Sequence, residues 1–310
     1  SGQDVYRKDL VSGQSARLIC GYVMANAGEG ESTQDVVYSG HNLIAENGAL
    51  LAESARLGSG ILYSEIDVER LEIDRRKNSL FETEDSHVCV PFQLRETETK
   101  LSRFVDPSPF VPANEAARRK HCEDVFAIQA MGLKKRMEHT GAATAVIGIS
   151  GGLDSTLALL VIAKAFDLMK KSRKDIVAVT MPGFGTTDRT YDNACKLARA
   201  LGCSLTEINI KEAVKQHFAD IGQDMDNHDV TYENSQARER TQILMDIANK
   251  ENALVIGTGD MSELALGFAT YNGDHMSMYG VNAGVPKTLM RHLVRYYADT
   301  CGNEKLKAIL

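Results

Sequence analysis

Short apolar runs alternate with longer helical patterns from residue 115 onward, and this alternation constrains the fold more than any other feature of the chain. The longer segments repeat apolar residues at the spacing of one helix face, and the short runs have the length of buried strands. Strands that alternate with helices predict an α/β fold with a parallel sheet covered on both faces. The expected strands are 143–149, 176–180, 205–210 and 254–256, and the expected helices are 115–139, 153–169, 188–201 and 233–250.

The first part of the chain has a different pattern. Strands are expected at 35–39, 43–45 and 61–66, a helix or a strand at 16–24, and a charged helix at 67–77. The dipeptide Asn47-Gly48 is typical of a hairpin turn. Four of the six prolines lie between residues 91 and 112, and proline fixes φ and removes a backbone donor. We therefore expect a first domain at 1–85, a linker at 86–114 and a second domain at 115–310.

Composition excludes some classes of function. The formal net charge of -7 gives no basic excess for nucleic-acid binding, and no apolar run approaches the roughly 18 residues of a membrane span. The six cysteines include no CxxC pair, which favours reduced thiols and a cytoplasmic location. Because the chain begins at Ser1 and not at Met, we expect it to be a piece of a longer protein.

A glycine-rich segment, Gly148-Ile-Ser-Gly-Gly-Leu-Asp-Ser155, follows the first strand of the second domain. Backbone N–H groups in such a turn, at the start of a helix, cradle a phosphate chain, and the hydroxyls of Ser150 and Ser155 add donors. The carboxylate of Asp154 suits Mg²⁺ bridged to phosphates. The segment lacks the lysine of a Walker A loop and the spacing of GxGxxG. The alternative is a tight strand–helix turn without a ligand.

A second glycine turn, Gly257-Thr-Gly-Asp-Met-Ser-Glu263, follows the fourth strand. The carboxyl ends of parallel strands meet at one edge of the sheet, where ligands bind. Thr258 offers a hydroxyl there, and Glu263 offers a second carboxylate for Mg²⁺. The alternative for Glu263 is a solvated residue that the helix dipole favours.

Three further positions suit substrate binding. Asp274 and His275 lie in a polar loop, 270–278, of the kind that closes over substrates. Lys287 opens a helix from which it can reach a phosphate. Asn234 and Arg238 share one helix face, and arginine suits phosphate or carboxylate recognition. For each of these residues the alternative is an ordinary solvated side chain.

These segments together resemble a known family. The loop Ser150–Ser155 is similar to the pyrophosphate loop of the ATP-pyrophosphatase superfamily. The segments 233–240, 257–263, 272–279 and 285–287 resemble NAD synthetases in order and spacing, and 181–187 is typical of their glutamine-dependent form. The resemblance implies a doubly wound parallel sheet of the adenine nucleotide α hydrolase type and a homo-oligomer, expected to be a dimer.

The resemblance also implies a reaction with ATP and Mg²⁺ as cofactors. AMP passes from ATP to the nicotinate carboxylate of deamido-NAD, pyrophosphate leaves, and ammonia, from glutamine in the full-length enzyme, displaces AMP to give NAD. The residues carried over for ATP are Gly148, Ser150, Gly151, Gly152, Asp154, Ser155, Thr258 and Lys287. Those for deamido-NAD are Asn234, Arg238 and Asp274, with Asp274 also catalytic, and the metal ligands are Asp154 and Glu263.

The match has departures. Tyr271 and Met278 stand where short, ammonia-dependent members have Lys and Asp, so substrate contacts differ there. The segments 6–10, 14–17, 31–33 and 39–48 resemble the later part of a nitrilase-like glutaminase domain, an incomplete α/β sandwich. The nucleophilic cysteine of that domain lies upstream, and Cys20 fits a structural role better, so we expect no glutamine hydrolysis. Another amidotransferase of the superfamily and an inactive nucleotide-binding fragment stay open as alternatives.

Overall fold

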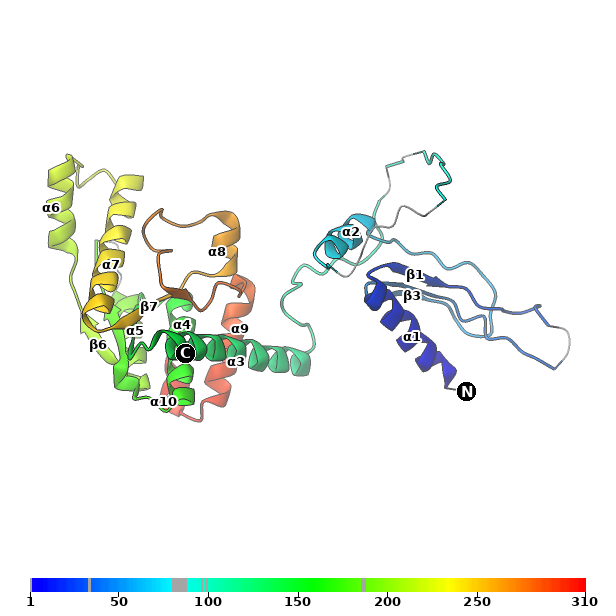
Figure 1. The fold of residues 1–310 in the computed structure, drawn as a ribbon, viewed down its shortest axis with the longest axis horizontal. Coiled ribbons are helices and arrows are strands. Elements are labelled where there is room, and N and C mark those ends of the chain that lie inside the picture. The colour runs from blue at the N-terminus through cyan, green and yellow to red at the C-terminus, as the bar shows by residue number, and fades with distance from the viewer. Residues whose placement is uncertain (1, 33–34, 80–87, 96, 99, 185–187) are drawn as a thin grey trace. The chain divides into compact units, whose positions relative to one another are not determined.

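The protein is described by a computed structural model that covers residues 2–32, 35–79, 88–95, 97–98, 100–184 and 188–310. The chain folds into two units, Ser1–Asp106 and Pro107–Leu310 (Figure 1). The boundary between the units lies inside the segment expected as a linker. Residues 33 and 185–187, which belong to two of the motifs compared above, lie outside the described residues.

The first unit is a helix on a small antiparallel sheet. Its elements are α1 (Gln3–Leu18), β1 (Gly21–Met24), β2 (Leu43–Glu46), β3 (Ala49–Glu53) and α2 (Val68–Arg76), with the sheet order β1-β2-β3 (Figure 1). Val11 of α1 is buried with Leu43 and Ala45 of β2. The hairpin between β2 and β3 turns at Asn47 and Gly48, which have φ of 43° and 88°. Positive φ at both positions is what a tight hairpin turn requires.

Two expected strands do not form. Residues 35–39 and 61–66 are irregular, and the apolar side chains of Ile61 and Tyr63 are 78% and 77% exposed. Near the end of segment 61–66 a side chain forms the hydrogen bonds instead. The carboxylate of Glu65 accepts hydrogen bonds from the backbone N–H groups of Ser102 and Arg103. An apolar alternation makes a strand only where a neighbouring backbone completes the ladder. The ambiguous segment 16–24 holds the end of α1 and the whole of β1.

The second unit is a sheet enclosed by helices. Its strands are β4 (Thr144–Gly148), β5 (Ile176–Thr180), β6 (Ser204–Glu207), β7 (Ala253–Gly257) and β8 (Tyr279–Gly280). Its helices are α3 (Glu115–Thr140), α4 (Leu153–Met169), η1 (Arg173–Asp175), α5 (Asp188–Leu201), α6 (Lys211–Ile221), α7 (Val230–Lys250), α8 (Met261–Leu266), α9 (Lys287–Thr300) and α10 (Glu304–Ile309). The strand expected at 205–210 corresponds to β6, which begins one residue earlier and ends at Glu207.

The sheet has the order β6-β5-β4-β7-β8, and every pair of neighbours is parallel. The strand that comes first in this unit, β4, thus lies in the middle, and the chain winds outward from it in both directions. This confirms the doubly wound α/β fold. In such a sheet the order reverses between β4 and β7, and the crevice at the carboxyl ends of those two strands is where ligands bind.

Side chains on the two faces of the sheet enter two separate cores. Ile147 of β4 packs with α3, α4 and α9, whereas Val146 packs with α6 and α7. The middle of α4, from Leu157 to Phe166, is almost entirely buried, and it covers the first of these faces. Burial on both faces explains the continuous apolar strands that the sequence shows. Among the described helices, none combines the length and apolar character that crossing a membrane requires.

Candidate active site

The loop between β4 and α4 has a shape that depends on glycine. Gly151 has φ of 80°, and a Cβ built there would lie 2.0 Å from the carbonyl oxygen of Thr190. Within the loop, Ser150 Oγ accepts the backbone N–H of Gly152 at 3.2 Å and lies 3.3 Å from Ser155 Oγ. The loop is therefore folded by its own hydrogen bonds beside the N-terminus of α4, as a phosphate-binding turn requires.

A cavity of about 620 Å³ opens beside this loop, within the usual range for small-molecule sites. Six of the residues predicted from the sequence line it: Gly148, Ser150, Gly152, Ser155, Thr258 and Asp274. The end of β5 and one side of α7 supply further parts of the wall, with Met181, Gln236 and Arg240 among the lining residues. Burial lowers the pKa of Arg240, and its Nε donates to the carbonyl of Met181 at 3.4 Å.

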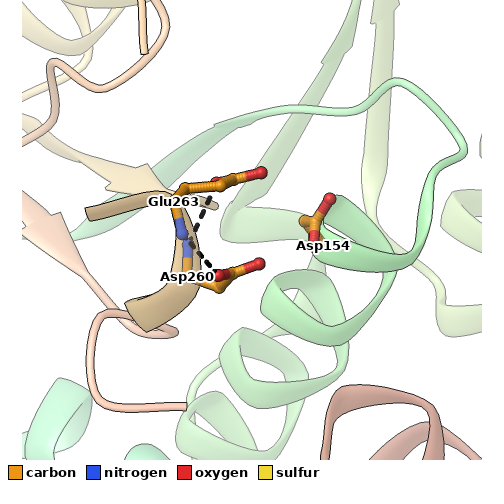
Figure 2. A group of neighbouring side chains, drawn as sticks. All are labelled: Asp154, Asp260 and Glu263. Atoms are coloured by element: carbon orange, nitrogen blue, oxygen red, sulfur yellow. Dashed lines mark hydrogen bonds between the residues drawn. The ribbon is translucent and has the colours of Figure 1, made fainter. Parts of the chain in front are cut away.

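Three carboxylates converge next to the glycine loop. One oxygen from each of Asp154, Asp260 and Glu263 lies within 4.8 Å of the others, and Figure 2 shows their carboxyl groups directed toward a common space. Asp154 comes from the first turn of α4, and the other two come from the start of α8. Mg²⁺ prefers such hard oxygen ligands and takes one or two carboxylates together with phosphate oxygens. The predicted metal ligands Asp154 and Glu263 thus lie together, and the group fits the ion.

Asp260 did not figure among the predicted site residues. It is 0% exposed, and its Oδ1 accepts the backbone N–H groups of Ser262 and Glu263 at 2.7 and 3.0 Å. Glu263 Oε2 in turn accepts the backbone N–H of Asp260 at 3.1 Å (Figure 2). This reciprocal capping box orients Glu263 before any ligand arrives. The Asp-x-x-Glu spacing is a known sequence signal for it.

Lys287 lies among the same carboxylates. Its Nζ is 2.6 Å from Asp154 Oδ1, 2.6 Å from Asp260 Oδ2 and 3.0 Å from Glu263 Oε1. Burial on its own would lower the pKa of this lysine, but the three carboxylates raise it above its ordinary value. The side chain predicted to contact ATP therefore contacts the predicted metal ligands here, and its contact with a phosphate stays a prediction.

Asn282 fastens the two glycine turns to each other. Its buried side chain donates to the carbonyls of Asp154 and Thr258 at 3.0 and 3.1 Å. Its own oxygen accepts the side-chain amide of Gln129, from α3, at 3.1 Å. No sequence pattern had indicated Asn282 or Gln129, because their partners are distant along the chain.

The residues predicted for deamido-NAD gather around the loop that follows α8. Asn234 Oδ1 accepts the hydroxyl of Thr270 at 2.8 Å, and Asp274 Oδ1 accepts the N–H of Thr270 at 2.8 Å. Arg238 Nε donates to the carbonyl of Tyr271 at 3.1 Å. Asn234 and Arg238, from α7, thus contact the loop that carries Asp274, and Asp274 and Thr270 of this loop line the cavity. Their substrate contacts stay predictions.

His275 lies in the same loop. Its Nδ1 is 2.7 Å from the carbonyl oxygen of Thr270, and its side chain is exposed. This hydrogen bond helps to fold the loop, and His275 does not line the cavity.

Comparisons with known proteins agree with this geometry. The sequence model of the NAD synthase family matches residues 125–303. The glutamine-dependent NAD(+) synthetase of Mycobacterium tuberculosis is 44% identical over 307 residues, which cover 94% of this chain and 45% of that protein. The enzyme of the same description from Mycobacterium leprae is 43% identical over 94% of this chain and 45% of its own length. The chain thus spans about half the length of these curated relatives.

A solved structure supports the fold. The glutamine-dependent NAD+ synthetase of Acinetobacter baumannii, in complex with adenosine diphosphate, aligns with 99% of this chain and 51% of its own, with a TM-score of 0.57 and 22% identity. An NH3-dependent NAD synthetase of Campylobacter jejuni aligns with 60% of this chain, with a TM-score of 0.51 and 24% identity. Taken with the match of the family model and the identity to the mycobacterial proteins, these findings show that the chain belongs to the NAD synthase family.

Proposed function

We propose that the second unit binds ATP and forms NAD from deamido-NAD by way of an adenylated carboxylate. The observation that carries this proposal is the group of three carboxylates beside a glycine loop, at the edge of a doubly wound sheet. Backbone N–H groups of the loop and the hydroxyls of Ser150 and Ser155 bind the phosphates of ATP. Thr258 lines the same cavity from the second turn.

Asp154 and Glu263 would hold Mg²⁺ in this proposal. The ion, when bound, neutralises the negative charge of the phosphates as pyrophosphate leaves. Asp260 keeps Glu263 in place through the capping box, and Asn282 keeps the turn that carries Asp154 beside the turn that carries Thr258. These contacts fix the ligands in advance, which is what electrostatic stabilisation of a transition state requires.

The reaction has two steps, and in each step one bond between heavy atoms forms and one breaks. A carboxylate oxygen of deamido-NAD attacks the α-phosphorus of ATP, and the bond to pyrophosphate breaks. Ammonia then attacks the carboxyl carbon, AMP leaves with the bonding pair, one proton of the ammonia passes to solvent, and the amide of NAD remains. Asn234 and Arg238 from α7, with Asp274 from the loop that they contact, bind and orient deamido-NAD, and Asp274 acts beside the reacting groups.

We further propose a homo-oligomer in the cytoplasm, with deamido-NAD and ammonia or glutamine as the other reactants. The six cysteines are all free thiols, which fits a reducing compartment. Glutamine is included as a nitrogen donor because the relatives named above are described as glutamine-dependent.

The test is the formation of AMP and pyrophosphate from Mg-ATP, with ammonium as the nitrogen source. We expect both products only when deamido-NAD is present, together with NAD in equal amount. The variant Asp154→Asn should lower the rate by about 10²-fold or more, because it removes a metal ligand from the site. Pyrophosphate release with a different acid, and none with deamido-NAD, would assign the chain to another amidation reaction.

A further inference from the structure

The ammonium of Lys287 occupies the centre of the three carboxylates. It lies 2.6 Å from one oxygen of Asp154, 2.6 Å from one oxygen of Asp260 and 3.0 Å from one oxygen of Glu263. A magnesium ion binds oxygens at about 2.0–2.1 Å. An ammonium already this close to the three oxygens fills the space that a divalent cation bound to them would need.

Two of the three remaining carboxylate oxygens are already bonded to the backbone. Asp260 Oδ1 accepts two backbone N–H groups, and Glu263 Oε2 accepts the backbone N–H of Asp260. Apart from the ammonium of Lys287, Asp260 Oδ2 has no hydrogen-bond partner among the described residues. Lys287 thus holds one oxygen of each carboxylate, and of the other oxygens only Asp154 Oδ2 is left, which is fewer ligands than the three that Lys287 holds.

The side chain of Lys287 has the freedom to leave, whereas that of Asp260 does not. Its side chain is 41% exposed, while that of Asp260 is 0% exposed. The lysine stem is flexible, and the backbone N–H of Lys287 stays bonded to Ser262 Oγ at 3.1 Å. The side chain can therefore swing away while the start of α9 remains in place.

We infer that Lys287 and the divalent cation are alternative occupants of the carboxylate group. In the nucleotide-free protein the ammonium of Lys287 balances three carboxylates that would otherwise repel one another. When Mg-ATP binds, the ammonium leaves the carboxylates and turns to the phosphates. This inference rests on the proposed ATP function and adds to it that the free metal ion binds weakly until the nucleotide arrives.

The first experiment measures Mn²⁺ binding to the nucleotide-free chain by electron paramagnetic resonance. Lys287→Met should bind Mn²⁺ at least tenfold more tightly than the wild type, and Lys287→Arg, which keeps the charge, should stay close to the wild type. Lys307→Met is the matched control, since Lys307 pairs with Asp299 on the surface, and it should change nothing. Equal Mn²⁺ affinity in the wild type and Lys287→Met would overturn the inference.

The second experiment uses the wild type alone, so it does not depend on how well a variant folds. Amine labelling followed by mass spectrometry reports how accessible Lys287 is. Labelling of Lys287 should rise when Mn²⁺ alone saturates the protein. Unchanged labelling at saturation would refute the exchange. Neither experiment involves turnover, so failure of the exchange and failure of NAD formation give different results.

Discussion

Each oxygen of Asp260 has its own task, and two substitutions separate the tasks. Asp260→Asn keeps an acceptor for the cap of α8 but loses the anion beside Lys287, whereas Asp260→Ala loses both. We expect Asp260→Ala to be less stable than Asp260→Asn by about 1 kcal/mol, the usual worth of a helix cap. Urea unfolding followed by circular dichroism gives the difference.

Asp229 provides the control, since it caps α7 through two backbone N–H groups and forms no ion pair with a lysine of the described residues. Asp229→Ala should cost less than Asp260→Ala, because Asp260 is buried and its loss also unbalances an ion-pair group. Equal losses would mean that the contact with Lys287 contributes nothing to stability.

Gly151 is the residue on which the shape of the glycine-rich loop between β4 and α4 most depends. Gly151→Ala puts a Cβ against the carbonyl of Thr190, in addition to the strain of a positive φ. Gly202, at the end of α5, has φ of 79° but open space around it, so Gly202→Ala should cost only the roughly 1–2 kcal/mol of the left-handed conformation. We expect Gly151→Ala to lose measurable ATP binding by calorimetry and Gly202→Ala to retain it. Retained binding in both would show that the loop adapts.

How far a site residue could be predicted depends on where its partners lie. Asp154 and Glu263 lie in the first turns of helices that follow strands after a short glycine turn, so their places at one edge of the sheet were predictable from local patterns. Asp260 had a local signal as well, the Asp-x-x-Glu spacing, but its burial beside Lys287 depends on how α9 packs. Asn282 had none, because its partners Asp154 and Gln129 are 128 and 153 residues away along the chain.

At the scale of elements, the sequence was most informative where an element buries a long apolar pattern. The bounds of α4, β5 and α5 agree with the predicted segments 153–169, 176–180 and 188–201. Helices α1 and α6 were not predicted; α1 buries only Val11 and Ser15, and α6 only Val214 and Phe218. The strand expected at 61–66 did not form because alternation alone supplies no pairing partner.

The two glycine turns depend on each other through Asn282. Asn282→Ala leaves the carbonyls of Asp154 and Thr258 without this donor in the interior, at a cost of about 1–3 kcal/mol. In a double-mutant cycle with Gln129→Leu, the two losses should not add, because the side chains share a hydrogen bond. Thermal unfolding of the four proteins gives the coupling energy, and simple additivity would contradict the shared role.

The segment around Arg103, in the first unit, is held to β2 by an ion pair that depends on pH. Arg103 donates to both carboxylate oxygens of Glu46, at 3.0 and 2.9 Å, and this hydrogen bonding lowers the pKa of Glu46. A carboxylate whose pKa is lowered by folding stabilises the fold at pH values above its unfolded-state pKa. This stabilisation is lost as the pH falls through the folded-state pKa.

Hydrogen exchange of the β2 amides measures this effect. Protection in the wild type should exceed that in Glu46→Gln at neutral pH, and the difference should close below about pH 4.3. Comparing the two proteins at the same pH removes the intrinsic pH dependence of exchange. A difference that stays constant with pH would show that the carboxylate charge is not what holds Arg103.

At the scale of the whole molecule, each unit has a core of its own. The buried apolar cluster of the first unit is Val11, Leu43 and Ala45, whereas the second unit buries two large clusters on the faces of its sheet. We expect the first unit to unfold at the lower urea concentration, since burial of apolar area is the main source of stability. Mg-ATP at 100 times its dissociation constant should stabilise the second unit by about 2.7 kcal/mol.

Hydrogen exchange measured peptide by peptide with mass spectrometry reports the protection of each unit separately in that experiment. Added protection should be confined to 107–310, and protection spread equally over 2–106 would mean that the nucleotide contacts or orders both units.

The ammonium of Lys287 among the three carboxylates also determines which cellular concentration sets the occupancy of the metal site. A site that free magnesium filled at all times would hold its ion whatever the energy supply. With a lysine already in that place, occupancy by the ion follows the nucleotide that delivers it. In the proposed reaction, formation of NAD would then follow the concentration of Mg-ATP and would be insensitive to modest changes in the concentration of free magnesium.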